Sequence, residues 1–282
     1  MKRRFYNNMG VIYSGQTITN TVVSAATNDT LNQAVANALV AAGWSLIKSG
    51  SSDGVWRVRS AATPQGMQGD VWMWRSTGSP APSLFAASSA LATTNASGLQ
   101  EQVGQTLVVG TGYTYQLVAN AYYFYLFRAA TPMPAQSCFF FTVPYIPPNL
   151  VGLVNSIMCA YGSAQTTDTI GVGGLFSSGA NAFAYLNGQG SARSGQFSLF
   201  SVATYSKPTW FDGSCEYYEP RIMAFQTNGS GAQSGSLHAC GYQWDALVVN
   251  QPLPRGTTLS YDGGTWYVLT EGTDPALMIK VA

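Results

Sequence analysis

Charged side chains are scarce in this chain. Asp, Glu, Lys and Arg make up 9% of its 282 residues, whereas an average globular protein carries about 25%. Charge keeps isolated globular proteins dispersed in water, so a chain with so little of it is suited to a surface that neighbouring subunits cover. The composition favours a component of an assembly over a freely diffusing enzyme.

A clustered basic surface is also lacking. The formal net charge is +1 at pH 7, and the one basic cluster is Lys2, Arg3 and Arg4 at the N-terminus. Proteins that bind nucleic acid by neutralising phosphates need such a surface. We expect residues 1–10 to form a solvated arm, the alternative being an arm that reaches a neighbouring subunit or nucleic acid. No other nucleic-acid contact and no small-molecule partner are predicted.

Long apolar runs are absent. The longest stretches, Ala121–Phe127 and Cys138–Tyr145, are strand-sized and aromatic, well short of the roughly 18 residues of a membrane helix. The N-terminus lacks the apolar core and small-residue cleavage site of a secretory signal. We therefore expect no membrane partner, and production in a cytoplasm.

Cysteine and histidine do not form a metal-binding pattern. The spacing of Cys138, Cys159, Cys215 and Cys240 contains no Cys-x-x-Cys pair and matches no zinc site. We expect buried free thiols, with one or two disulfides as the alternative if the assembled protein later leaves the cell. The sole histidine, His238, would share a strand face with Cys240, but a metal site needs three or four ligands. A Ser-His-Asp triad would depend on the same histidine.

Two glycine-rich patterns resemble catalytic or phosphate-binding motifs. Ser52 lies at the centre of Gly50-Ser-Ser-Asp-Gly54, but a nucleophile elbow is followed by a helix. The next segment, Val55–Ser60, has the pattern of a strand, so a hairpin turn is the better interpretation. The stretches Gly171–Gly174 and Gly188–Gly190 lack the Gly-Lys-Ser/Thr ending of a phosphate-binding loop, and we interpret them as turns.

The densest acidic group is Asp212, Glu216 and Glu219, flanked by Trp210 and tyrosines. Paired carboxylates beside aromatic rings are typical of a glycosidase cleft. In an extended segment, however, Glu216 and Glu219 would face opposite sides. We expect hydrogen-bonded or solvated acids at a turn, with calcium binding by Asp212 as an alternative that lacks the Asp-x-Asp-x-Asp-Gly pattern. No catalytic, cofactor-binding or metal-binding residue is predicted, and no cofactor.

Residues 11–75 predict a small α+β unit. A helix is expected over Thr30–Ala42, because apolar residues recur there at helical spacing, Asn28 and Asp29 offer N-caps and Gly43 supplies a stop. Around it, strands are expected at 11–13, 17–23, 44–48, 55–60 and 70–75. The unit contains Trp44, Trp56, Trp72 and Trp74. We expect at least two of these tryptophans to pack in the core against the helix, and the alternative is a sugar-binding platform.

Residues 76–104 are rich in Ser, Ala and Gly and predict a linker, an insertion or a weakly helical connector around Leu84–Leu91. Residues 105–282 predict a larger antiparallel β-sandwich or barrel, because many short apolar segments alternate with Gly, Asn, Asp and Pro turns. Asp262-Gly-Gly264 is the best hairpin signal. Strands are expected at 106–109, 113–119, 122–128, 138–144, 152–161, 168–172, 183–186, 196–202, 218–226, 237–249, 257–261, 265–269 and 277–281.

Nearly every residue of Ala121–Phe127 is large and apolar, which is typical of a strand that is buried on both faces. One face could belong to the domain core and the other to a subunit contact, since aromatic residues are enriched in interface cores. Alternatively, both faces lie inside one sandwich. The sequence leaves the two interpretations open.

Both ends of the chain resemble virion proteins of tailed bacteriophages in style and composition. The segments that carry this resemblance are Leu31–Trp44, Ser60–Gly66, Gly241–Asn250, Arg255–Thr258 and Trp266–Thr270. The resemblance implies a structural part of the neck, tail, baseplate or capsid surface, present in many symmetric copies. It implies residence in the virion after production in the host bacterial cytoplasm, and it carries over no catalytic residue.

The sequence thus predicts a non-enzymatic structural subunit that self-associates and contacts other virion proteins. The first alternative is a receptor- or carbohydrate-binding component of the particle, whose mark would be an exposed Trp/Tyr platform. The second is a cell-wall glycan hydrolase that uses Glu216 or Glu219.

Overall fold

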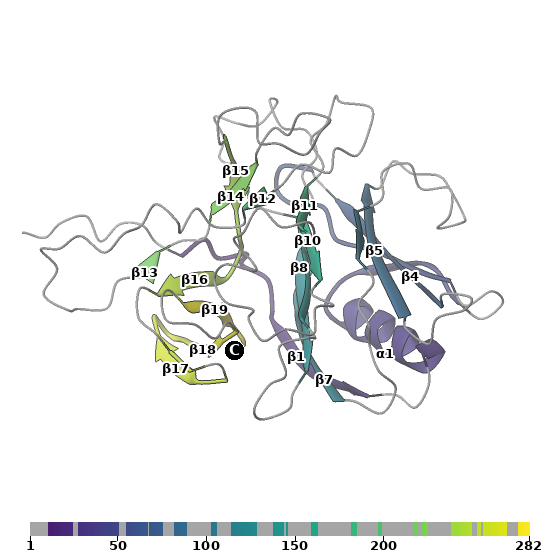
Figure 1. Ribbon diagram of the computed structural model, residues 1–282, viewed down its shortest axis with the longest axis horizontal. Coiled ribbons are helices and arrows are strands. Elements are labelled where there is room, and N and C mark those ends of the chain that lie inside the picture. Colours follow the sequence, from purple (N-terminus) through teal and green to yellow (C-terminus); the bar gives the residue numbers. More distant parts are fainter. Residues whose placement is uncertain are drawn as a thin grey trace, which may run out of the picture.

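The fold is mainly β, with antiparallel sheets and, in the part of the chain described, a single helix (Figure 1). This confirms the predicted fold class at that level. The computed structural model describes residues 11–24, 28–50, 55–66, 68–75, 82–88, 103–105, 114–128, 138–143, 145, 159–162, 182–184, 197–198, 217–218, 221–224, 238–249, 253–254, 256–269 and 276–282.

Helix α1 (Asn28–Ala41) ends where the sequence predicts. The N–H of Trp44 donates to the carbonyl of Leu39 at 3.0 Å, and the N–H of Gly43 donates to the carbonyl of Val40 at 3.1 Å. These two bonds define a Schellman cap. Gly43 has the left-handed φ of 100° that the cap requires, so glycine is the residue that fits there.

The N-terminal sheet packs against α1. Its strands, in spatial order, are β2 (Ser45–Lys48), β3 (Trp56–Arg59), β4 (Gly69–Arg75), β5 (Pro82–Ser88) and β6 (Val103–Gln105). Val58, Val71 and Met73 are fully buried, and α1 contacts β3 and β4. The weak helix predicted around Leu84–Leu91 is wrong for residues 84–88, because these pair with β4 as a strand.

The central sheet joins segments that lie far apart in the sequence. Its order is β1 (Thr19–Ser24), β7 (Thr114–Ala119), β8 (Tyr123–Arg128), β9 (Cys138–Thr142), β10 (Cys159–Gly162) and β11 (Ala182–Ala184). Strand β1 pairs with β7 over its whole length. A strand of the predicted α+β unit therefore shares a sheet with strands of the predicted β domain. The predicted domain boundaries stay a prediction.

Both faces of β8 are covered within the chain. Phe124 meets Trp44, which follows α1, in an edge-to-face contact with ring centroids 5.8 Å apart. Phe127 stacks on Tyr267 at 5.1 Å. Every residue from 121 to 127 is buried. The interpretation in which both faces lie inside one molecule is therefore correct for this strand, and the alternative of a subunit contact there is wrong.

The C-terminal sheet lies on the other side of the central sheet from α1 (Figure 1). Its order is β13 (Tyr217–Tyr218), β16 (Ala246–Val249), β19 (Ala276–Lys280), β18 (Gly264–Val268) and β17 (Thr258–Tyr261). The predicted hairpin is confirmed: β17 pairs with β18, and Asp262 and Gly263 have φ of 46° and 69°. Positive φ at both residues is typical of a type I′ turn.

Three predicted strands differ from the structure. Residues 11–13 form no regular strand, although Ile12 accepts a backbone hydrogen bond from Asp245. The predicted strand 237–249 is interrupted at residues 243–245 and forms β15 (His238–Tyr242) and β16. The predicted strand 218–226 is also divided: its first residue belongs to β13, and residues 221–224 form a strand of another sheet. A further small sheet consists of β12 (Phe197–Ser198), β14 (Arg221–Ala224) and β15. The strands predicted at 106–109 and 168–172 lie outside the described residues.

Candidate functional site

The most connected polar group in the described residues surrounds the buried carboxylate of Asp245. The hydroxyl of Tyr123 donates to Oδ2 at 3.2 Å, and Nδ2 of Asn120 donates to the same oxygen at 3.3 Å. The backbone N–H of Ser14 donates to the carboxylate at 3.3 Å. We call Ser14, Asn120, Tyr123 and Asp245 the Asp245 cluster.

Local backbone geometry positions this cluster. Asp245 adopts a left-handed φ of 49° between β15 and β16, a conformation that Asp and Asn tolerate better than most residues. Its N–H donates to the carbonyl of Ile12 at 2.8 Å, and its carbonyl accepts from the N–H of Lys280 at 2.9 Å. The residue thus ties the N-terminal segment to the last strand of the chain.

Asn120 performs the same task at the tip of the β7–β8 hairpin. Its Oδ1 accepts hydrogen bonds from the N–H groups of Tyr122 and Tyr123, at 2.8 and 3.2 Å. Its Nδ2 donates to Oγ of Ser14 at 2.7 Å, and its carbonyl accepts from Nε1 of Trp44 at 2.7 Å. The hairpin tip therefore connects α1, the N-terminal segment and the C-terminal sheet.

Burial dominates the electrostatics of the cluster. It raises the pKa of Asp245 above its ordinary value, although hydrogen bonds from Ser14 and Tyr123 and the charge of Lys280 oppose the rise. Burial, followed by the charge of Asp245, also raises the pKa of Tyr123. The cluster contains no histidine and no cysteine. A phenol with a raised pKa beside a buried carboxyl is suited to holding segments together by hydrogen bonds rather than to nucleophilic chemistry.

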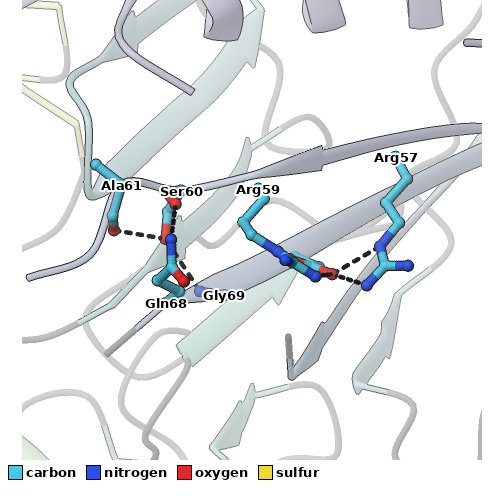
Figure 2. Close-up of polar contacts among 7 residues, drawn as sticks. Arg57, Arg59, Ser60, Ala61, Gln68 and Gly69 are labelled. Carbon is cyan, nitrogen blue, oxygen red and sulfur yellow. Dashed lines mark hydrogen bonds and ion pairs between the residues drawn. The ribbon is translucent and has the colours of Figure 1, made fainter. Parts of the chain in front are cut away.

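A second buried group is ionic. In the N-terminal sheet, Arg59 lies directly opposite Asp70, and the guanidinium groups of Arg57 and Arg59 both reach the carboxylate of Asp70 (Figure 2). The Nε atoms lie 2.6 and 2.7 Å from its oxygens. The hydrogen bond to Asp70 raises the pKa of Arg59 further, so Arg59 keeps its positive charge at physiological pH.

The segment that leads into β4 is held beside this ionic group. The Nε2 atom of Gln68 donates to the carbonyl of Ser60 at 3.2 Å, and the N–H of Gly69 donates to Oγ of Ser60 at 3.0 Å (Figure 2). The N–H of Ser60 in turn donates to the carbonyl of Gly69 at 2.9 Å. These bonds hold the two ends of the β3–β4 connection together. The polar groups of Ser60, Gln68 and Gly69 therefore have a structural role.

The structure brings together few of the residues that the sequence singled out. His238 and Cys240 lie on β15, and Cys138 and Cys159 lie on the neighbouring strands β9 and β10; only their backbones are described. Among the described residues, no three His, Cys, Asp or Glu side chains are arranged to hold a metal ion. The candidates outside the described residues are Lys2, Arg3, Arg4, Ser52, Gly171–Gly174, Gly188–Gly190, Asp212, Cys215, Glu216 and Glu219.

Two of the four N-terminal tryptophans belong to the core, as expected. Trp44 and Trp56 are buried, and Trp44 packs between α1 and the β7–β8 hairpin through its contacts with Phe124 and Asn120. For Trp72 and Trp74 the structure describes only their backbone positions on β4. In the described part of the chain, no helix is both long and apolar enough to cross a membrane.

Three of the five large apolar side chains that are exposed in the described residues lie on strands at sheet edges. Val22 of β1 is 61% exposed, and Leu46 and Ile47 of β2 are also exposed. Strand β1 ends the central sheet and β2 ends the N-terminal sheet. Single exposed apolar residues are normal. An edge strand that carries apolar residues and no charge, however, can pair with a strand of another chain.

The Asp245 cluster was not predicted from the sequence. Its members lie up to 231 residues apart, and the one local signal is a carboxylate inside the otherwise apolar stretch 244–249. A scan against protein-family models finds no match, and searches of the curated proteins and of the solved structures find no similar protein.

Proposed function

We propose that this chain is a structural subunit of a bacteriophage particle, which assembles through protein–protein contacts into a multi-copy neck, tail, baseplate or capsid-surface structure. The observation that carries the proposal is the combination of few charged residues with exposed apolar residues on edge strands, namely Val22, Leu46 and Ile47. The resemblance of both chain ends to phage virion proteins is the reason that we name a phage particle as the assembly.

Assembly by this chain would depend on apolar burial and on uncharged hydrogen bonds. Each Å² of apolar surface removed from water contributes about 25 cal/mol, although the loss of translational and side-chain freedom offsets much of it. Ser, Thr, Asn and Gln fix the register of a contact without the large desolvation cost of charged groups. The scarcity of charge lowers the cost of covering the surface.

The proposal includes the finer architecture expected from the sequence: a small N-terminal α+β unit followed by a larger β-sandwich or barrel. Two contacts support the sandwich. Phe127 of the central sheet stacks on Tyr267 of the C-terminal sheet, and Tyr123 donates to Asp245 between the same two sheets. Face-to-face packing of two antiparallel sheets is the defining feature of a sandwich.

The test is whether the chain is present in particles. Phage particles carrying this gene product should be purified by density gradient, digested and quantified by mass spectrometry against a known capsid protein. A fixed stoichiometry of several copies per particle is expected, together with gold-labelled antibody at one location in electron micrographs. Absence of the chain from infectious, gradient-pure particles would overturn the proposal.

A carbohydrate-binding component is the second candidate. Strand alternation puts positions 72 and 74 of β4 on the face opposite Val71 and Met73, the face that also carries the buried group of Arg57 and Asp70. Two tryptophans at alternate positions of one strand are the arrangement that could stack on a sugar. Binding to a glycan array that is lost in Trp72→Ala, while the variant keeps its circular-dichroism spectrum, would favour this candidate.

A further inference from the structure

Strand β1 is an edge strand without the usual protection. Within the described residues it pairs with β7 and with no strand on its other side. Proteins blunt such edges with short strands, bulges, proline or lysine. Strand β1 is six residues long, its sequence Thr-Asn-Thr-Val-Val-Ser contains neither charge nor proline, and its register with β7 is regular.

Strand β2, which ends the N-terminal sheet, shows the usual protection of an edge strand. Strand β2 has four residues, its pairing with β3 is interrupted between Leu46 and Lys48, and it ends in a lysine. It therefore carries three of the usual devices, whereas β1 carries none. Among the described sheet ends, β17 also lacks charge, proline and a bulge, but it has four residues. Strand β1 is therefore the longest unprotected edge in the described part of the chain.

The register identifies the backbone groups that point outward. The N–H of Asn120 donates to the carbonyl of Tyr123 at 3.0 Å, so residue 120 faces β8. Backbone groups alternate sides along a strand, and the residues of β7 that face β1 are therefore Tyr115, Leu117 and Ala119. Their partners in β1 are Thr19, Thr21 and Val23. The residues whose N–H and C=O groups face away from β7 are Asn20, Val22 and Ser24.

The side chains of the same three residues are exposed. Asn20, Val22 and Ser24 share one face of β1 and are open to solvent, whereas Val23 on the opposite face is buried. The outward edge thus presents three unpaired backbone positions with a central apolar side chain and a small polar one at each end. Only another extended strand can pair with all three in register.

We propose that β1 pairs antiparallel with β1 of a second copy of this chain, centred on Val22. This places Val22 opposite Val22 of the second copy and Asn20 opposite Ser24 of the second copy. All three positions become hydrogen-bonded pairs, each exchanging two backbone bonds. The edge is self-complementary, as a two-fold contact requires, and brings no like charges together. This inference rests on the proposed assembly function and names one of its contacts.

A cysteine cross-link tests the pairing directly. In a hydrogen-bonded pair the Cα atoms lie about 5.5 Å apart, within the range that a disulfide spans. Val22→Cys should therefore form a covalent dimer under mild oxidation, at least about tenfold more than the matched Thr21→Cys, since residue 21 of the two copies would be diagonal neighbours roughly 7–8 Å apart. The wild-type chain controls for the four native cysteines. Equal dimer yields from all three chains would overturn the pairing.

A proline variant tests the same edge without new chemistry. Val22→Pro removes an outward N–H and leaves the hydrogen bonds to β7 intact, which is how edge strands accommodate proline. We expect it to weaken self-association at least tenfold in sedimentation equilibrium, whereas Val22→Thr, which keeps the N–H and the branched side chain, should associate nearly as wild type. Equal association of the two variants, with equal circular-dichroism spectra, would overturn the pairing.

The two proposals fail separately. If the chain is found in particles but Val22→Cys gives no excess dimer, the β1 pairing is wrong and the assembly function stands. If Val22→Cys dimerises but the chain is absent from purified particles, the virion function is wrong and the β1 pairing stands as a property of the isolated protein.

Discussion

At the scale of single residues, Asp245 combines a costly environment with an unusual backbone. It is buried, adopts a left-handed φ and accepts hydrogen bonds from three other residues. Asparagine tolerates the same backbone and keeps one acceptor oxygen, but it does not ionise. Comparing the stability of wild type with that of Asp245→Asn therefore separates the effect of the charge at residue 245 from the effect of its shape.

The first prediction concerns pH. Because burial raises the pKa of Asp245 above 3.8, the folded chain holds this proton more tightly than the unfolded chain. Between the raised pKa and pH 3.8, the contribution of Asp245 to the free energy of unfolding should therefore rise as the pH falls. As the pH falls over this range, the free energy of unfolding of wild type should increase relative to that of Asp245→Asn. The expected increase is about 1.4 kcal/mol for each unit by which the pKa is raised.

Urea unfolding of both chains at closely spaced pH values measures this difference, and the other carboxylates cancel because both chains contain them. Parallel stability curves for the two chains would contradict the assignment of the titration to Asp245.

The second prediction compares two aspartates of opposite burial. Asp70 is fully buried between Arg57, which is nearly buried, and Arg59, which is partly exposed. Asp70→Asn leaves both arginines without their carboxylate and should cost about 3 kcal/mol of unfolding free energy. Asp262 accepts from Tyr13 in an exposed contact, so Asp262→Asn should cost less than about 1 kcal/mol. Urea midpoints measure both, and similar losses would contradict a stabilising role for the ionic cluster.

The residue scale is where the sequence predicted least. Gly43 and the turn at Asp262 and Gly263 were predictable, because each depends on neighbours within a few positions. The role of Asp245 was not, because its partners Ser14 and Tyr123 lie 231 and 122 residues away. No local pattern contains that information.

At the scale of elements, the end of α1 is fixed by both backbone and packing. A Cβ on Gly43 would lie 3.3 Å from Cβ of Ala121 at the hairpin tip, in addition to the strain of its positive φ. A Cβ on Gly66, which also has a positive φ, would meet no atom within 4 Å. The two glycines therefore differ in packing and share the backbone requirement.

The third prediction uses this difference. Gly66→Ala should lose about 1–2 kcal/mol of unfolding free energy through backbone strain, and Gly43→Ala should lose about 1 kcal/mol more, because the new methyl group overpacks the contact with Ala121. Thermal or urea unfolding compares the two variants. An equal loss would show that the α1 cap and the hairpin separate freely enough to accommodate the methyl group.

Local signals explain which elements could be predicted. The sequence of helix α1 has candidate N-caps at its start, a glycine stop at its end and apolar residues at helical spacing, and β17 and β18 flank a two-residue turn. Strand β5 was missed because Pro-Ser-Leu-Phe-Ala-Ala-Ser has the small, weakly propensive composition of a connector, and its pairing with β4 provides the hydrogen bonds that make it a strand.

At the scale of the whole molecule, the central sheet is covered on both of its sides around β7 and β8. Helix α1 contacts β1 and β7 on one side, and the C-terminal sheet meets Phe127 on the other. The aromatic strand β8 is therefore buried within the molecule and offers no surface to another subunit. The proposed association would use other surfaces, among them the edge strands.

The fourth prediction is that the purified chain self-associates in a manner that salt does not reverse. Surface ion pairs weaken as salt screens them, but contacts made by apolar residues and uncharged strand edges do not. Light scattering across a dilution series should give oligomers at both low salt and about 0.5 M salt. A monomer at high concentration would contradict the assembly function.

The β1–β7 pairing has a consequence for biosynthesis. Thr19 and its partner Ala119 are 100 residues apart, and a ribosome adding roughly 5–20 residues each second needs about 5–20 s to span that distance. Throughout that interval the nascent strand has two open sides and no partner in its own chain. On a polysome, where several nascent copies emerge close together, the same segment is a point at which premature entanglement between sister chains can begin.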